Sequence, residues 1–373
     1  MGITEAAGRH LQATARQAAT AGGGTLEAAT QAAPAATGTA MGHATPHAGI
    51  AAALHLPAPV RDAATQAGIQ RSDVWLLHRS TTTRPLPLFD EDLRSLGATP
   101  RYVDLDQLQV DPSGIRHAGQ ELPIPDAVIS RGVRDHEMPV LQQLEDAGAH
   151  LVNRPEPMLV ARHKALMPEM FARGGVPHPD TIVVRSPDDL HHAARELGLP
   201  LVVKDDRGFG GQSVWLARSS ADLDALAGEH LLDTSPPRLL IGQRFHAEAG
   251  ARDLRVSVVR DIDGTPQVAA VMERVGAAGD FRANGPNGNT VRWLDPRVPS
   301  ESLGREELEV ALRATDAAGL DVAGVDVMRT DAGPMVIEIN STPGLVQTDV
   351  AGLPRMFQES PRIAAYAVHG ARP

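Results

Sequence analysis

Two carboxylates and one amide near the end of the sequence are spaced as a metal site requires. Glu338 and Asn340 lie two residues apart in an apolar run, so on a strand their side chains point to the same side. Asp326 lies in the preceding apolar run, and residues 331–333 supply a turn between the two strands. The predicted hairpin gathers oxygen donors of the kind that hold Mg²⁺ together with substrate phosphates. The alternative is an exposed hairpin face that carries ordinary acids.

The lysines mark a second candidate site. Only two of the 35 basic residues are lysines, Lys164 and Lys204, and all the others are arginines. A lysine offers a compact ammonium on a flexible stem, which suits phosphate oxygens. Lys204 ends an apolar run and precedes the glycine-rich residues 208–213, whose backbone N–H groups could approach an anion. The alternatives are two lysines that survived by chance and a plain turn, because the loop matches neither the Walker nor the GxGxxG pattern.

Composition limits the classes of protein to which the chain can belong. Its 373 residues suggest two or three domains, and 42% hydrophobic with only 3% aromatic residues predicts an aliphatic core. The lack of cysteine excludes disulfides, thiolate metal sites and cysteine nucleophiles. A net charge of −11 argues against nucleic-acid binding. No apolar run reaches the roughly 20 residues of a membrane span, and no compact signal segment is visible, so a cytoplasmic protein is expected.

The elements that must position these residues follow an α/β pattern. Residues 1–70 are rich in Ala, Gly and Thr and are expected to form a flexible extension, with a docking arm that folds on a partner as the alternative. Residues 71–156 predict an N-terminal domain with a small, largely parallel sheet, because apolar runs alternate with helical patterns. The predicted strands are 74–77, 101–105, 127–129 and 151–153, and the predicted helices are 89–96 and 136–147.

Two α+β units and a tail complete the predicted organisation. The central unit, 157–242, begins with a helix that carries Lys164 and Met170 and that Pro168 interrupts after the lysine, and the next unit, 243–352, contains the hairpin of the metal site. Residues 353–373 are interrupted by prolines and are expected to pack loosely. The predicted strands of the two units are 181–184, 199–204, 214–217, 254–259, 268–273, 324–328 and 335–339, and the further helices are 188–197 and 305–318.

Six short motifs within residues 74–344 resemble those of the ATP-grasp ligases, specifically the RimK-like branch that joins amino acids to a carboxylate. Each motif is weak alone, but their common order and spacing make the resemblance specific. It implies an ATP-grasp fold, in which two α+β subdomains that follow a small N-terminal domain clamp ATP between them. The motifs are Ala161–Lys164, Leu201–Lys204, Asp253–Arg255, Gly279–Asn284, Asp321–Asp326 and Glu338–Gly344.

The same resemblance implies how ATP would be bound. The two lysines would hold its phosphates, and the oxygen donors of the hairpin would hold two Mg²⁺ ions, with Mn²⁺ as an alternative. At the hinge that meets adenine, Arg244 replaces the acid that the family usually carries. The segments 208–213 and 276–289 are candidate lids. The nucleotide-binding candidates are Lys164, Lys204, Gly208, Gly210, Gly211, Gln243, Arg244, Phe245, Asp253, Arg282 and Asn284, and the metal-ligand candidates are Asp326, Glu338 and Asn340.

Arginines are the catalytic candidates that the resemblance implies. They are Arg255, Arg274 and Arg282. The last lies where the family contacts the phosphate and acyl phosphate. The first two would grip a carboxylate or stabilise developing charge, and the alternative is that they form salt bridges with neighbours such as Glu273 and Asp280. Arg131 matches a family position at the mouth of the first domain, where it would bind substrate or simply pair with Asp135.

The implied function is an ATP-dependent carboxylate–amine ligase that releases ADP and phosphate. A carboxylate is a poor electrophile, so transfer of the γ-phosphoryl group would first make an acyl phosphate, which the amine of an amino acid or peptide would attack. The alternatives are a macrocyclase that closes links in a precursor peptide, and a nucleotide-binding regulator without catalysis. Residues 345–349 lack the acidic pattern of the glutamate-adding members, which argues against glutamate transfer to a ribosomal protein. Homo-oligomerisation is left open.

Overall fold

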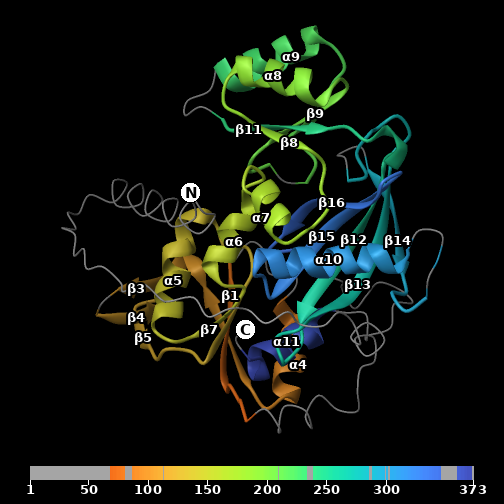
Figure 1. Ribbon diagram of the computed structural model, residues 1–373. Coiled ribbons are helices and arrows are strands. Elements are labelled where there is room, and N and C mark those ends of the chain that lie inside the picture. The colour runs from red at the N-terminus through yellow and green to blue at the C-terminus, as the bar shows by residue number, and fades with distance from the viewer. Residues whose placement is uncertain are drawn as a thin grey trace.

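The computed structural model contains three main sheets, which follow one another along the chain (Figure 1). Almost all of the predicted extension, residues 1–70, lies outside the described part of the chain. Among the described residues, no helix has both the length and the apolar character needed to cross a membrane. The structure describes residues 68–79, 86–111, 113–208, 210–232, 238–284, 288–298, 300, 303–345 and 359–371.

The N-terminal domain is built on a parallel sheet of four strands, as predicted, and the strand order is β2-β1-β6-β7. Trp75 of β1 is buried on one face and Leu76 on the other, so both faces are covered and the strands are continuously apolar. A small antiparallel sheet between β2 and β6 was not predicted. The elements are β1 (Asp73–His78), α4 (Leu86–Ser95), β2 (Thr99–Asp104), β3 (Leu108–Asp111), β4 (Gly114–His117), β5 (Gln120–Leu122), β6 (Ala127–Ser130), α5 (Met138–Asp146) and β7 (His150–Val152).

The C-terminal tail does not pack loosely, so that prediction is wrong. Helix α11 (Glu359–His369) fills one face of the N-terminal sheet beside α4, where the blue end of the chain meets the orange beginning in Figure 1. Its Ile363 and Ala367 are completely buried, and Tyr366 donates a hydrogen bond to Asp321 at 3.0 Å. Pro361 falls in the first helical turn, where an N–H has no intrahelical acceptor, so the proline does not break the helix.

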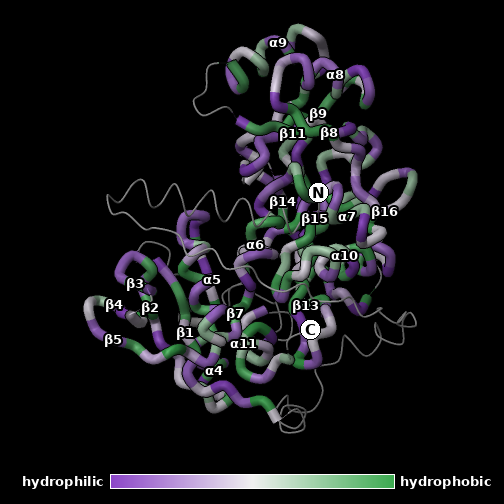
Figure 2. Tube along the Cα trace, turned by 60° about the vertical axis from the view of Figure 1, so that its left-hand side comes forward, coloured by the Kyte–Doolittle hydropathy of each residue, from purple (hydrophilic) through white to green (hydrophobic). Residues whose placement is uncertain are grey.

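The central subdomain is an antiparallel sheet of order β10-β9-β11-β8, covered by two helices. Figure 2 shows hydrophobic stretches along β9 and β11, the two inner strands. Ser186 caps α8 by accepting a hydrogen bond from the N–H of Asp189. The elements are β8 (Thr181–Val184), α8 (Pro187–Leu197), β9 (Leu201–Asp205), β10 (Val214–Ala217), α9 (Ser220–Ala227) and β11 (Leu240–Arg244).

The C-terminal subdomain is a five-stranded antiparallel sheet of order β14-β13-β12-β15-β16, with α10 packed on one face. The predicted hairpin is confirmed, because β15 and β16 pair and Asp326 lies opposite Glu338. The edge strand β14 was not predicted, and its largely exposed side chains explain why no apolar pattern marks it. The elements are β12 (Arg252–Arg260), β13 (Pro266–Gly276), β14 (Asn289–Leu294), α10 (Arg305–Ala318), β15 (Val322–Thr330) and β16 (Gly333–Asn340).

The prediction that a helix carries Lys164 is wrong, although the predicted interruption at Pro168 is confirmed. Helix α6 (Pro155–Arg162) ends before Lys164 and α7 (Met167–Arg173) begins after it, so the lysine lies in a tight turn. In a continuous helix the N–H of residue 168 would donate to the carbonyl of residue 164. Pro168 has no N–H and its ring would clash with that carbonyl, so the helix breaks there and restarts with the proline in its first turn.

Candidate functional site

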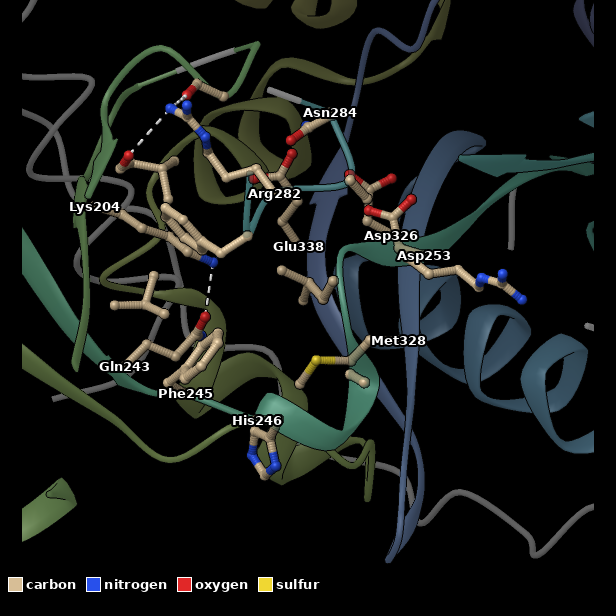
Figure 3. A pocket seen from close by; sticks show the side chains of 18 of the residues that line it. Lys204, Gln243, Phe245, His246, Asp253, Arg282, Asn284, Asp326, Met328 and Glu338 are labelled. Carbon is tan, nitrogen blue, oxygen red and sulfur yellow. Dashed lines mark hydrogen bonds between the residues drawn. The ribbon is translucent and has the colours of Figure 1, made fainter. Parts of the chain in front are cut away.

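A cleft between the central and C-terminal sheets collects most of the predicted site residues. Its empty volume is about 830 Å³, open solvent included. Figure 3 shows Lys204 and Gln243 on one side of it, and Asp253 and Asp326 on the opposite side. The predicted residues that line the cleft are Lys164, Lys204, Gly208, Gly210, Gly211, Gln243, Arg244, Phe245, Asp253, Arg282, Asn284, Asp326 and Glu338. The predicted residues that lie outside its lining are Arg131, Arg255, Arg274 and Asn340.

Lys204 stands at the end of β9 and is almost completely buried. Its Nζ donates a hydrogen bond to Oε1 of Gln243 at 2.7 Å, and the amide nitrogen of Gln243 in turn donates to Thr181 at 3.1 Å. The pKa of Lys204 is lowered to about 8, mainly because burial removes the ammonium from water. The charge of Glu338 raises this pKa and the charge of Lys164 lowers it, so Glu338 offsets only part of the effect of burial. The ammonium is therefore poised to gain from an anionic ligand.

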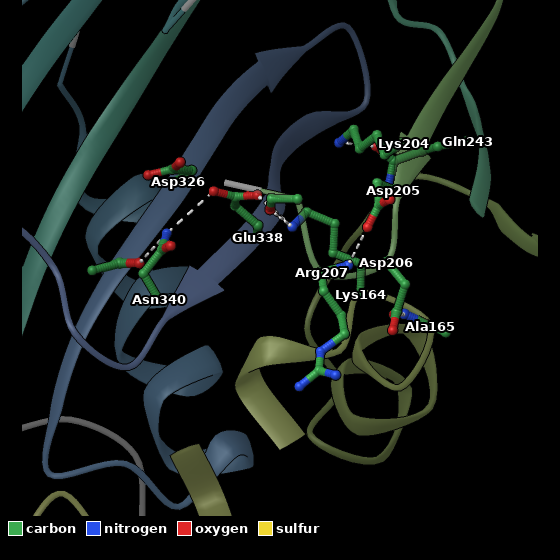
Figure 4. Close-up of polar contacts among 12 residues, drawn as sticks. Lys164, Ala165, Lys204, Asp205, Asp206, Arg207, Gln243, Asp326, Glu338 and Asn340 are labelled. Atoms are coloured by element: carbon green, nitrogen blue, oxygen red, sulfur yellow. Dashed lines mark hydrogen bonds and ion pairs between the residues drawn. The ribbon is translucent and has the colours of Figure 1, made fainter. Parts of the chain in front are cut away.

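Lys164 approaches the same space from the turn between α6 and α7. Its Nζ donates to the carbonyl of Gly208 and lies 3.8 Å from Oε2 of Glu338. Figure 4 shows this lysine between the glycine-rich loop and the carboxylates of the C-terminal sheet. The two lysines are 40 residues apart in sequence, yet they reach one cleft from two different elements, as the phosphate-binding interpretation requires.

The glycine-rich loop between β9 and β10 packs directly on the connection between β13 and β14. Gly210 and Gly211 have φ values of +64° and +69°, a region that glycine adopts without strain. A Cβ on Gly211 would lie 2.8 Å from the carbonyl oxygen of Asn284, so the close approach needs glycine. Arg282 donates to the carbonyl of Gly211 at 2.9 Å and also pairs with Asp280 at 2.9 Å. The two candidate lids therefore meet over the cleft.

The predicted metal ligands lie together on the β15–β16 hairpin. Asp326 and Glu338 are cross-strand partners, and the Asn340 amide lies 3.2 Å from Oε1 of Glu338. Figure 4 shows the three side chains next to one another. Asn340 lies outside the lining of the cleft and donates to Glu338, which is part of that lining. Carboxylate and amide oxygens are hard donors, so the donor set fits Mg²⁺.

Arg255 and Arg274 bind two acids that line the cleft, Asp253 and Asp326, rather than Glu273 and Asp280, the sequence neighbours considered as alternatives. Arg274 donates two hydrogen bonds of 2.7 Å to Asp253 and lies 2.9 Å from Asp326, which Arg255 also binds through both carboxylate oxygens. Burial, and next the charge of Asp326, raise the pKa of Asp253 to about 6. Burial opposes ionisation of Asp326 too, but the two arginines hold its pKa well below its ordinary value. Asp326 is therefore ionised at neutral pH.

At the hinge at the end of β11, Arg244 lines the cleft, but its guanidinium pairs with two groups outside the lining. The Arg244 Nε lies 3.0 Å from a carboxylate oxygen of Asp180, and its Nη1 donates to the carbonyl of Leu197 at 2.9 Å. Its backbone N–H donates to the backbone carbonyl of Asp180 at 2.9 Å, so both the side chain and the backbone of Arg244 fix this strand end. Phe245 meets Phe281 edge to face, with ring centroids 6.3 Å apart. This part of the cleft therefore offers backbone groups and aromatic rings, which suit a flat base.

Several lining residues were not predicted, and strand alternation could have found two of them. Val202 precedes Lys204 by two residues on β9, and Met328 follows Asp326 by two residues on β15, so each shares a face with a predicted residue. Both line the cleft. His246 also lines it, directly after the hinge, and no spacing rule in the sequence indicated this histidine.

Arg131 lies away from the cleft. Its Nη2 donates to the carbonyl of Pro343, in the segment that follows the metal hairpin, and burial lowers its pKa to about 10. The alternative pairing with Asp135 is not seen for it, because Asp135 instead pairs with Arg162 at 2.7 Å. The structure thus joins Arg131 to the loop beyond the metal hairpin, and a role in substrate binding stays a prediction.

Comparisons with known proteins agree with this geometry. Residues 161–352 match the model of the RimK-like ATP-grasp domain family. A probable alpha-L-glutamate ligase of Citrobacter koseri is 35% identical over 262 residues, which cover 66% of this chain and 80% of that protein. A RimK-domain ATP-grasp protein from Sphaerobacter thermophilus has a TM-score of 0.58 at 18% identity, over 80% of this chain and all of that one. The ATP-grasp ligase PsnB, complexed with its minimal precursor, has a TM-score of 0.54 at 21% identity, over 74% and 92%.

The two solved structures share the fold, which confirms the predicted α/β architecture of three sheet-containing regions. The family match spans both lysines, the glycine-rich loop and the metal hairpin, the features that define the cleft. The Citrobacter relative extends the similarity to most of that ligase. The chain therefore belongs to the RimK-like ATP-grasp family, and it is a ligase.

Proposed function

We propose that the protein joins a carboxylate to an amine at the expense of ATP, through an acyl-phosphate intermediate. One observation carries this proposal: two ammonium groups and a hairpin of oxygen donors, brought from distant parts of the chain, face each other around one cleft. A binding module without catalysis has little need for a second, metal-holding wall. That contrast favours the ligase over the regulator considered from the sequence.

The charges of the cleft support one orientation of ATP. RimK-like ATP-grasp proteins use ATP with Mg²⁺. The phosphates would lie between the two lysines and Glu338, and the base would lie at the hinge beside Phe245. Asp326, Glu338 and Asn340 would hold two ions, which would neutralise charge on the phosphates. The glycine-rich loop and the segment of Arg282 would cover the phosphates and exclude water.

The chemistry then needs two balanced steps. An oxygen of the substrate carboxylate attacks the γ-phosphorus and ADP leaves, so the carboxylate acquires a good leaving group. The amine nitrogen attacks the carbonyl carbon, inorganic phosphate leaves and the amine loses a proton. Both steps build negative charge on oxygens, and the cationic groups nearest the phosphates are Lys164, Lys204 and Arg282. No protein nucleophile takes part, which is compatible with a chain without cysteine.

The substrates are proposed by chemical class. The amine is an amino acid or peptide, and L-glutamate is the first to test because the Citrobacter relative bears the name of an alpha-L-glutamate ligase. The sequence of residues 345–349 argued against glutamate transfer, and positions 346–349 lie outside the described residues, so that argument stays a prediction. The carboxylate would belong to an amino acid, a peptide or a protein, and homo-oligomerisation likewise stays a prediction.

The test is a product analysis with the full-length protein. Incubation with ATP, Mg²⁺ and pools of amino acids and peptides should release ADP and phosphate, and mass spectrometry should find an amide that joins two pool members. A peptide that loses one water without gaining a partner would identify the macrocyclase instead. Release of AMP and pyrophosphate would contradict the acyl-phosphate route, because those products indicate adenylation.

A further inference from the structure

Asp206, two residues after Lys204, contacts three consecutive residues of the turn that carries Lys164. Its Oδ2 lies 2.6 Å from Nδ1 of His163, and its Oδ1 accepts a hydrogen bond from the backbone N–H of Ala165 at 2.8 Å. Its backbone carbonyl accepts from the N–H of Lys164 at 3.1 Å. The side chain is only 3% exposed, so these contacts are shielded from water. They fix the backbone on both sides of the lysine.

Asp206 is itself fixed to the strands that carry the other lysine. Its N–H donates to the carbonyl of Leu239 at 2.9 Å, directly before β11, and Lys204 pairs with Ile241 in the β9–β11 ladder. Strand β9 ends at Asp205, so Lys204 is the last-but-one residue of the strand and lines the cleft, while Asp206 begins the turn that follows and contacts the turn of Lys164. Figure 4 shows Asp206 beside Ala165, with Lys204 above it on the same chain segment. One short segment therefore sets the places of both ammonium groups.

We propose that Asp206 is a positioning residue that places the Lys164 ammonium against the phosphates of the bound nucleotide, with His163 holding the carboxylate in orientation. This inference rests on the proposed function, because it requires that the cleft binds ATP. Lysine has a flexible stem, so its head is placed only as well as its backbone is fixed. Displacing such a group by about 1 Å can cost about 10²-fold in rate.

A purely structural role for Asp206 is the competing explanation, because a buried carboxylate that closes a turn also stabilises the subdomain. The two explanations differ in the effect of a second substitution. If Asp206 acts through Lys164, its loss has nothing further to remove once that ammonium is gone, so the two effects are not additive. If its role is structural, its loss weakens binding in every background.

The test is a pair of double-mutant cycles, read by calorimetric binding of a non-hydrolysable ATP analogue with Mg²⁺ to the full-length chain. We expect Asp206→Ala to weaken binding about tenfold or more in the wild-type background and to cause no further loss beside Lys164→Ala. In the Lys204→Ala background, Asp206→Ala should weaken nucleotide binding by the same factor as in the wild-type background. Asp206→Asn keeps an acceptor for the N–H of Ala165, so it should lose less affinity, and it replaces the alanine variant if that variant does not fold.

Asp222→Ala is the matched control for stability, because it removes part of the capping box of α9 in the same subdomain, outside the lining of the cleft. It should lower the melting temperature and leave the nucleotide affinity unchanged. Equal losses from Asp206→Ala in the wild-type and Lys164→Ala backgrounds would overturn the inference, as would an unchanged affinity. A wild-type protein that binds no nucleotide would overturn the proposed function and this inference with it.

Discussion

The central and C-terminal sheets face each other across the cleft, and they treat buried charge in opposite ways. On the central sheet, Lys204 lies beside the neutral amide of Gln243, and its pKa falls to about 8 because it is desolvated. On the C-terminal sheet, Asp326 is buried as deeply, but Arg255 and Arg274 bind it. The charge of Asp326, on the side that we call the anionic wall, is therefore balanced by arginines of its own sheet. On the opposite side, the cationic wall, Glu338 offsets only part of the desolvation of Lys204.

This difference shows how the charges on the two sides of a cleft can favour one class of ligand before the ligand makes any contact. A buried ammonium with a neutral partner gains most from a ligand that brings negative charge. A buried carboxylate that is already paired with arginines stays ionised and in place, which is what a metal ligand needs. If the protein binds ATP as proposed, the cationic wall would select for its phosphates and the anionic wall would supply a fixed frame for the ions that accompany them.

The largest effects should come from removing one side chain from each wall. Lys204→Ala and Glu338→Ala should each lower kcat/KM at least about 10²-fold, because in the proposed function each removes a charge that would contact the phosphates or their ions. The rate of ADP release measures the loss, and circular dichroism checks that the fold is kept. Arg297→Ala removes an exposed arginine that pairs with Asp295, so it should keep the wild-type rate. Either wall variant at near-normal rate would sink the site assignment.

Breaking the balance of the anionic wall should destabilise the fold. Arg274→Ala leaves Asp253 without its two hydrogen bonds and Asp326 with one arginine, so the free energy of unfolding should fall by about 3–5 kcal/mol. Urea denaturation measures the change. Arg173→Ala removes an exposed ion pair with Glu169 and should cost less than about 1 kcal/mol. Equal losses of unfolding free energy in the two variants would mean that the buried arginine stabilises the fold no more than an exposed one does.

The cationic wall predicts a pH dependence of nucleotide binding. Lys204 is protonated below its pKa of about 8 and loses its charge above it, so affinity for the ATP analogue should fall as the pH rises from 7 to 9. Titration calorimetry at fixed ionic strength measures the trend. Lys204→Arg keeps a charge throughout this range, so its affinity, even if lower, should stay nearly constant. Parallel profiles for the two proteins would show that another group titrates.

The smallest effect should come from the segment that belongs to neither wall. Deletion of residues 1–68 should leave the rate of ATP hydrolysis unchanged and should spare the contact between the Ile69 carbonyl and His369. Deletion through Arg71 also removes the hydrogen bond from its N–H to Val368 and should lower the melting temperature. If deletion of residues 1–68 yields no folded protein, the extension has a structural role.

Strand alternation predicted much of the fold and of the two walls. The runs around β9, β15 and β16 are short and apolar, so their polar residues stood out, and Asp326 and Glu338 were correctly expected to lie together on one hairpin. Helix α10 begins and ends where its pattern predicts, because apolar residues recur at helical spacing up to Gly319. These features depend on neighbours in sequence, which is why one chain sufficed to predict them.

Contacts between distant segments could not be predicted in the same way. Arg255 binds Asp326 across 71 residues, and no local pattern says which acid an arginine on a buried strand will meet. Pro168 indicated an interruption after Lys164, but the helical pattern on both sides did not indicate that the lysine itself lies between two helices. Helix α11 was missed because its apolar stripe is meaningful only against a sheet formed some 200 residues earlier.

The position of α11 also bears on how the protein folds during synthesis. The last strand of the N-terminal sheet ends at Val152, and the helix that covers one of its faces begins at Glu359. At about 5–20 residues per second, a ribosome needs roughly 10–40 s to make the intervening chain. Over that interval the nascent sheet exposes an apolar face, so a chaperone that shields it should raise the yield of native enzyme.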